Sequence, residues 1–252
     1  MAKFVLPFDL PNPQVTCEVP YGIAKRVADG SEHSQNRWMR LDESDSAVRA
    51  VESQGAAKAV AKKSKPKTLR LAVGVANNGQ YGFAVAPDGT LGLSVARGAV
   101  HTRWGDQAIE VNEHHTFLDQ GQIDTCFRVI AGQTDVVTAA LLPAALELNQ
   151  PLDVFAVFYP PTPHLDPAGA VLPFLQVSPQ TVQLGALRKA EDEDALIARL
   201  IESAGKATAV TLTLEGVEMI RLDLRPFEIT TLKIKRGNKG VTIKPCGLID
   251  AA

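Results

Sequence analysis

The stretch ALRKAEDEDALIARLIESAGKATAVTLTL, residues 186–214, changes character twice and decides the fold class. Apolar residues alternate with polar ones on both sides of a run of four acids at residues 191–194, and alternate again after Gly205. Alternation with period two is typical of β-strands that have one buried face. Charge alone suggests a helix at residues 189–194, but four adjacent carboxylates repel one another and favour water. We interpret the acidic run as a solvated turn, with calcium binding as a minor alternative because the DxDxDG pattern is absent.

The same alternation fills much of the remaining chain. Residues 69–76, 80–87 and 90–97 are strand candidates, separated by the turn signals Asn77-Asn78-Gly79 and Asp88-Gly89. These three strands are predicted to form a meander. Further strands are predicted at residues 124–130, 152–158, 171–177, 181–189, 207–214, 218–224 and 227–235.

About fourteen short strands with few helices predict an all-β protein, namely a large antiparallel β-sandwich with a small terminal β extension. The only stretch with helix-like composition, residues 45–63, is interrupted by Gly55. The expected organisation has four parts. They are an N-terminal strand segment of the sandwich (1–42), a flexible inserted linker (43–68), the main β-sandwich (69–205) and closing β-strands (206–252).

Composition and charge exclude several classes of protein. The 252 residues are 45% hydrophobic and 21% charged, with a net charge of −2, so no overall positive field attracts nucleic acid. The three cysteines, Cys17, Cys126 and Cys246, form no CxxC pair and suit a reducing compartment. No signal peptide or membrane-length apolar run is present. We therefore expect a cytoplasmic protein with no nucleic-acid or membrane partner.

Sequence motifs for chemistry are scarce. There is no GxSxG elbow, Walker A motif or GxGxxG opening a helix. His114 and His115 follow Glu113 and are interpreted as polar loop surface, with contact to a polar ligand or metal ligation as alternatives. His164 lies in a proline-rich loop with no second histidine nearby. No catalytic or metal-binding residues are assigned, and a binding or scaffolding role is the default.

Six stretches in order resemble the C-terminal β-sandwich region of glycoside hydrolase family 38 α-mannosidases. Together they run from Arg26 to Ile234, nearly the whole chain, and the fifth is the most similar. They are RVADGSEHSQNRWMRLD (26–42), VGVANNGQYGFAVAPDGTLGLSVARG (73–98), FLDQGQIDTCFRVIAG (117–132), LNQPLDVF (148–155), FLQVSPQTVQLGALRKAEDEDALIARLIESAGKATAVTLTL (174–214) and RPFEITTLKI (225–234).

This resemblance implies a galactose-mutarotase-like super-sandwich, in which the acidic turn joins strands 182–188 and 195–202. In the family, catalysis belongs to an N-terminal α/β domain with an aspartate nucleophile and a zinc ion. No stretch of this sequence matches that domain. The resemblance therefore implies no cofactor in this chain, with zinc expected only in a partner catalytic domain.

The sequence departs from the family pattern in one loop region. Ala96, Arg97, Gly98 and Ala99 replace a Leu-Arg-Ser-Pro run, and the loop before the Asp-Gln-Gly stretch at residues 119–121 is altered. In the family this region leans toward the sugar site, so the resemblance implies a carbohydrate-facing loop here. Its candidate residues are Arg97, Trp104, His114, His115, Asp119 and Gln120.

The function expected from this resemblance is a non-catalytic β-sandwich module or subunit. It would act with a separate α-mannosidase catalytic chain on a mannose-containing glycan. The alternatives are a free-standing carbohydrate-binding or structural module, and a truncated inactive relic. An independent hydrolase would need two carboxylates held roughly 5 to 10 Å apart, which sequence spacing does not reveal.

Overall fold

The computed structural model describes residues 2–44, 70–98, 120–152, 174–191, 193–214, 217–237 and 240–247. These residues form antiparallel sheets and one helix, which confirms the predicted all-β class. The chain divides into two compact units. The first unit is Met1–Val19 with Ala24–Gln150, and the second is Pro20–Ile23 with Pro151–Ala252.

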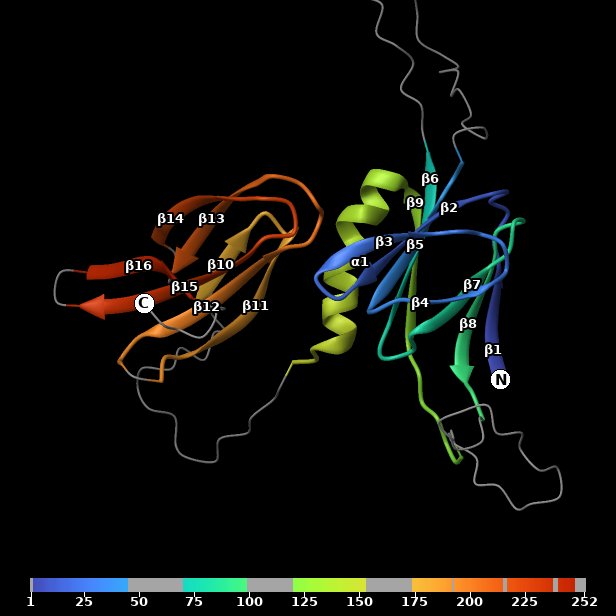
Figure 1. The fold of residues 1–252 in the computed structure, drawn as a ribbon, viewed down its shortest axis with the longest axis horizontal. Coiled ribbons are helices and arrows are strands. Elements are labelled where there is room, and N and C mark those ends of the chain that lie inside the picture. Colours follow the sequence, from blue (N-terminus) through green and yellow to red (C-terminus); the bar gives the residue numbers. More distant parts are fainter. Residues whose placement is uncertain are drawn as a thin grey trace, which may run out of the picture. The chain divides into compact units, whose positions relative to one another are not determined.

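The first unit contains two sheets and a helix (Figure 1). A four-stranded sheet has the order β1-β8-β7-β4, and a five-stranded sheet has the order β3-β2-β5-β6-β9. The elements are β1 (Ala2–Pro7), β2 (Gln14–Val19), β3 (Gly22–Arg26), β4 (Glu32–Ser34), β5 (Trp38–Asp42), β6 (Leu71–Asn77), β7 (Gly82–Val85), β8 (Thr90–Ala96), β9 (Phe127–Gln133) and α1 (Thr134–Asn149).

Apolar side chains from both sheets share one core, which makes the first unit a β-sandwich. Val73 and Val75 of β6 enter this core, and Phe83 of β7 and Leu93 of β8 meet them from the other sheet. The remaining buried members are Leu10, Val15, Cys17, Met39, Leu41, Val85 and Leu91.

Helix α1 packs against the other face of the five-stranded sheet, along β6. The residues of β6 that alternate with the core valines are small: Ala72, Gly74 and Ala76. A Cβ atom at Gly74 would lie 2.9 Å from both Leu141 Cδ1 and Val137 Cγ1 of the helix, so glycine is what admits this close approach. The helix is an unpredicted element, because its apolar sequence lacks a polar face and contains Pro143.

The predicted meander at residues 69–97 is wrong in its first member. Strands β7 and β8 form the expected hairpin, but β6 pairs with β5 and β9 in the other sheet. The turn signal at residues 77–79 therefore marks a crossover between sheets. Asn77 explains the bend, because its Oδ1 accepts hydrogen bonds from the backbone nitrogens of Gly79 (2.9 Å) and Gln80 (2.8 Å).

The second unit contains two further sheets (Figure 1). Their orders are β10-β13-β14 and β11-β12-β15-β16. Leu212 and Leu214 of one sheet share a core with Leu200 and Leu232 of the other, so this unit is a second, smaller sandwich. The strands are β10 (Leu175–Ser178), β11 (Val182–Lys189), β12 (Leu196–Glu202), β13 (Thr208–Leu214), β14 (Val217–Leu224), β15 (Ile229–Gly237) and β16 (Gly240–Cys246).

The observed division of the chain differs from the expected ranges. The first unit ends at Gln150, inside the expected main sandwich of residues 69–205. No boundary falls at residue 205, because β12 pairs with β15 and β10 pairs with β13. Strand β16 was not predicted. Most of the predicted strand at 152–158 and of the linker at 43–68 lies outside the described residues.

The acidic segment between Lys189 and Leu196 joins β11 to β12, which pair antiparallel, so a turn rather than a helix is observed. The next turn, predicted at Gly205, is also present. Gly205 has a φ of +69°, and a Cβ atom there would lie 2.5 Å from Cζ of Phe227. Glycine is needed at this position for both its conformation and its small size.

Candidate functional site

Two crossovers between the sheets of the first unit lie side by side. One runs from β4 to β5 through residues 35–37, and the other from β6 to β7 through residues 78–81. The Gln35 nitrogen donates to the Tyr81 oxygen at 2.9 Å, and the Asn77 nitrogen donates to the Arg37 oxygen at 2.9 Å. The Asn77 side-chain nitrogen donates to the Asn36 oxygen at 3.1 Å. We call this region the crossover end of the first unit.

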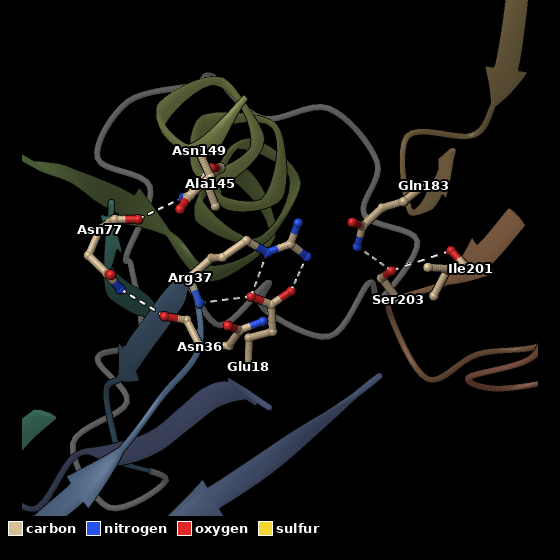
Figure 2. Close-up of polar contacts among 9 residues, drawn as sticks. All are labelled: Glu18, Asn36, Arg37, Asn77, Ala145, Asn149, Gln183, Ile201 and Ser203. Carbon is tan, nitrogen blue, oxygen red and sulfur yellow. Dashed lines mark hydrogen bonds and ion pairs between the residues drawn. The ribbon is translucent and has the colours of Figure 1, made fainter. Parts of the chain in front are cut away.

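Asn77 is the centre of this region and is fully buried, with 0% of its surface exposed. Its side chain shapes its own crossover and binds the neighbouring one. Its backbone oxygen accepts a hydrogen bond from Nδ2 of Asn149, the last residue of α1, at 2.8 Å (Figure 2). Asn149 also donates to the Ala145 oxygen at 2.8 Å. Asn77 therefore connects β6, both crossovers and the helix end.

A charged pair, Glu18 and Arg37, stands beside this network (Figure 2). Oε2 of Glu18 accepts hydrogen bonds from the backbone nitrogen and Nε of Arg37, both at 3.0 Å. Oε1 of Glu18 accepts a hydrogen bond from Nη2 of the same guanidinium group. The side chains are 9% and 22% exposed, respectively. Such a bidentate, partly buried pair fixes the direction of the guanidinium group.

Some polar atoms of the crossover end have no hydrogen-bond partner in the part of the chain that the structure describes. They include both amide atoms of Gln35 and the indole nitrogen of Trp38, although the two residues are only 5% and 8% exposed. Buried polar atoms without partners cost stability. A water molecule or a polar group of a ligand that reaches them would remove that cost.

The structure describes two of the six predicted carbohydrate-facing residues, Arg97 and Gln120, and both are exposed. Arg97 follows the end of β8, whose Ser94 lies beside Gly82 at the end of the second crossover. Gln120 lies six residues before Cys126, whose backbone nitrogen donates a hydrogen bond to Oδ1 of Asn78 at 2.8 Å. Asn78 is the first residue of the second crossover. Arg97 thus follows a strand that borders the second crossover, and Gln120 precedes a segment that is hydrogen-bonded to it.

The other four candidates, Trp104, His114, His115 and Asp119, lie outside the described residues. The positive charge of Arg97 acts on Glu32 of β4. The Ser94 hydroxyl donates to Glu32 at 2.6 Å and is the main cause that lowers the pKa of this carboxyl, followed by the charges of Lys3 and Arg97. This surface therefore carries charges of both signs.

Sequence reasoning missed the residues that organise the crossover end: Glu18, Gln35, Arg37 and Asn149. The available signal was Asn77, a polar residue that ends an alternating apolar strand. Its role was hidden because Asn-Asn-Gly also signals a simple hairpin.

The second unit has its own polar centre at the β12–β13 turn. Gln183 of β11 donates its side-chain amide to the Ser203 hydroxyl, which in turn donates to the Ile201 oxygen at 3.3 Å (Figure 2). Next to Ser203, the fully buried carboxylate of Glu202 accepts hydrogen bonds from four backbone nitrogens. They belong to Ala204 (2.9 Å), Gly205 (2.8 Å), Lys206 (3.2 Å) and Phe227 (3.0 Å). These contacts use both carboxylate oxygens of Glu202 to hold two turns in place.

Two properties of the described residues bear on catalytic chemistry: the pKa of the Cys17 thiol and the grouping of side chains that could bind a metal ion. Burial is the main cause that raises the pKa of the Cys17 thiol, against the opposing effect of Arg26, so the thiolate nucleophile is disfavoured. Within the described ranges, no three His, Cys, Asp or Glu side chains gather to hold a metal ion. In that same part of the chain, no helix has both the length and the apolar character needed to cross a membrane.

Comparison with known proteins places these observations in a family context. Residues 181–221, from the start of β11 into β14, match the model of the glycosyl hydrolases family 38 C-terminal beta sandwich domain. No curated protein matches the chain.

Two solved structures share the fold. One is an alpha-mannosidase from Enterococcus faecalis V583, and the other is a protein in the glycosyl hydrolase family 38 from Enterococcus faecalis. Each matches 92% of this chain with a TM-score of 0.60 and 14% sequence identity. The chain spans only about a quarter of their length, 25% and 26%. In its fold and in residues 181–221, the chain is thus similar to the C-terminal β-sandwich region of family 38 α-mannosidases, as its sequence predicted.

Proposed function

We propose that the chain is a non-catalytic β-sandwich subunit that acts with a separate α-mannosidase catalytic chain in the hydrolysis of mannose-containing glycans. The supporting observation is the fold match, which extends over 92% of this chain but 25% of a solved alpha-mannosidase. The proposal assigns zinc to the catalytic chain, as the resemblance to family 38 implies. No chemical step is assigned to this chain.

The crossover end of the first unit is the surface that we assign to the sugar side of the complex. Exposed Arg97 and Gln120 offer hydrogen-bond donors and an acceptor that suit sugar hydroxyls. The buried network around Asn77 holds the neighbouring crossovers rigid, which keeps the cost of ordering a binding surface low.

The test is a titration between this chain and a family 38 catalytic chain that lacks its own β region, followed by sedimentation velocity. The proposal predicts a stable complex. It also predicts that Arg97→Ala and Gln120→Ala each reduce mannoside turnover by the mixture about tenfold, the cost of one hydrogen bond to the substrate, while Lys25→Ala, an exposed change in the same unit, leaves turnover unchanged. Two chains that sediment independently at every concentration would refute it.

A free-standing carbohydrate-binding module is the second candidate, and exposed Tyr81 favours it. Tyr81 lies in the second crossover and is 57% exposed. A tyrosine ring offers an apolar face and a hydroxyl, which suits stacking on a sugar. Calorimetric titration with mannotriose tests this function. Tyr81→Ala is expected to abolish binding, whereas Tyr21→Ala, which removes a ring that is 68% exposed in another turn, is expected to preserve it.

A further inference from the structure

Strands β15 and β16 carry a group of lysines on the side of their sheet that faces away from the core. Leu232 and Ile234 of β15 belong to the core, so the alternating Lys233 and Lys235 point to the opposite face. In the register of the two strands, Lys233 pairs with Lys244 and Lys235 pairs with Thr242. We call Lys233, Lys235, Thr242 and Lys244 the lysine face.

The three lysines of the lysine face differ in their contacts with carboxylates. One carboxylate, that of Glu193 in the β11–β12 turn, contacts two of the lysines. Its Oε1 lies 2.8 Å from Nζ of Lys233, and its Oε2 lies 2.8 Å from Nζ of Lys235. Among the described residues, no carboxylate lies within ion-pair distance of Lys244. Lys244 therefore adds a positive charge directly opposite Lys233, and like charges directly opposite each other on neighbouring strands destabilise a sheet.

Protection of a sheet edge does not account for this arrangement. Lysines on edge strands discourage pairing with other chains, and β16 is an edge strand. Strand β15, however, is internal, with β12 on one side and β16 on the other. Lys233 and Lys235 therefore need another explanation.

The behaviour of Glu193 indicates what the lysine face attracts. Hydrogen bonds from Lys233 and Lys235 lower the pKa of Glu193 to about 2, and the charges of the two ammonium groups add to this effect. An oxyanion is thus strongly favoured in its ionised form at this position. The lysine face already binds the carboxylate of Glu193, and Lys244, opposite Lys233, has no carboxylate within ion-pair distance among the described residues.

We propose that the lysine face is a binding site for a phosphate or sulfate group, with Lys244 and Lys233 as the charged donors and the exposed Thr242 hydroxyl as a neutral one. Charge-assisted hydrogen bonds from lysine suit tetrahedral oxyanions. A phosphorylated sugar and a sulfated polysaccharide both supply this chemistry. The inference does not depend on the proposed action with a catalytic chain.

The test is calorimetric titration of the whole chain at low ionic strength with inorganic phosphate, mannose 6-phosphate and dextran sulfate, and with uncharged mannose as the control ligand. We expect the anionic probes to bind and mannose at the same concentration to give no heat from this face. Tighter binding of mannose 6-phosphate than of dextran sulfate identifies a sugar phosphate as the natural source, and the reverse order identifies a sulfated polymer.

Three variants assign the binding to the lysine face. Lys244→Gln is expected to weaken binding about tenfold, the cost of one charge-assisted hydrogen bond. Lys206→Gln, an equal charge change at an exposed position of the same unit, is expected to change little. Glu193→Gln removes the resident carboxylate and is expected to strengthen binding.

The opposite signs for Lys244→Gln and Glu193→Gln separate binding from loss of folding, because a damaged sheet weakens binding in both variants. Absence of binding by every anionic probe would overturn the inference. Equal effects of Lys244→Gln and Lys206→Gln would also overturn it, because they would show a response to net charge alone.

Discussion

Asn149, the last residue of helix α1, donates its side-chain amide to the backbone oxygen of Asn77 at the end of β6, 72 residues earlier in the chain. Asn77 in turn binds the neighbouring crossover at Asn36 and caps its own turn at Gly79 and Gln80. One buried residue, Asn77, thus joins both crossovers of the first sandwich to its helix through its side chain and its backbone oxygen. Several measurable consequences follow from contacts of this kind.

Replacement of Asn77 by alanine is expected to destabilise the first unit by about 2 kcal/mol or more, because it removes three side-chain hydrogen bonds in a buried site. Urea unfolding monitored by tryptophan fluorescence measures the change. Gln80→Ala is the matched control, since only the backbone of Gln80 takes part in this network. A loss that is no larger in Asn77→Ala than in the control would contradict the role given to Asn77.

Gly74→Ala is expected to destabilise the packing of α1 on β6 by about 1–3 kcal/mol, the usual cost of overpacking. The added methyl group would lie 2.9 Å from Leu141 Cδ1, which is too close for a relaxed contact. A double-mutant cycle with Leu141→Ala checks the cause. Gly74→Ala should cost less in the Leu141→Ala background than alone, and equal costs in both backgrounds would argue against the contact.

Glu202→Ala is expected to destabilise the second unit by about 3 kcal/mol or more. The substitution leaves four backbone N–H groups of two different turns without their acceptor, in a site where Glu202 is 0% exposed. Hydrogen exchange of the Ala204, Gly205 and Phe227 amides provides a local measurement. Glu191→Ala changes a side chain that is 82% exposed and should leave these amides protected. Unchanged protection in Glu202→Ala would show that the carboxylate is dispensable.

The ion pairs of Glu193 predict a defined pH dependence. Its pKa is lowered from 4.5 to about 2 in the folded chain, so its ion pairs stabilise the fold at pH values above 4.5. This contribution declines as the pH falls from 4.5 and is lost below about pH 2. The stability difference between the native chain and Glu193→Gln should therefore shrink over this window, as measured by thermal unfolding at a series of pH values. A difference that stays constant down to pH 2 would contradict the shifted pKa.

The strands of the second unit other than β16 were accessible from sequence because their alternation is regular and their turns carry Gly205 and a run of acids. The first unit was harder to predict. The sequence of strand β6 is typical of the first strand of a hairpin. Local sequence does not reveal that the chain crosses to another sheet after Asn77. Helix α1 escaped prediction because apolar residues lie on its exposed side as well as on the face that packs against Gly74, so its sequence, which also contains Pro143, shows no 3.6-residue pattern.

Sequence and structure contribute differently to the candidate site. Arg97 and Gln120 come from a family resemblance and stay predictions; both are exposed, and each is next in sequence to a segment that adjoins the second crossover. Glu18 and Arg37 are 19 positions apart, and their pairing depends on how β2 and the β4–β5 crossover meet in space. Charged residues at such separations give no local signal.

The most direct test of the proposed function is turnover of a chromogenic α-mannoside by this chain, by a family 38 catalytic chain without its β region, and by the two together, with zinc present. The account predicts turnover by the mixture well above the sum of the separate chains, and no turnover by this chain alone. Turnover by this chain alone, or a mixture no more active than the catalytic chain, would contradict it.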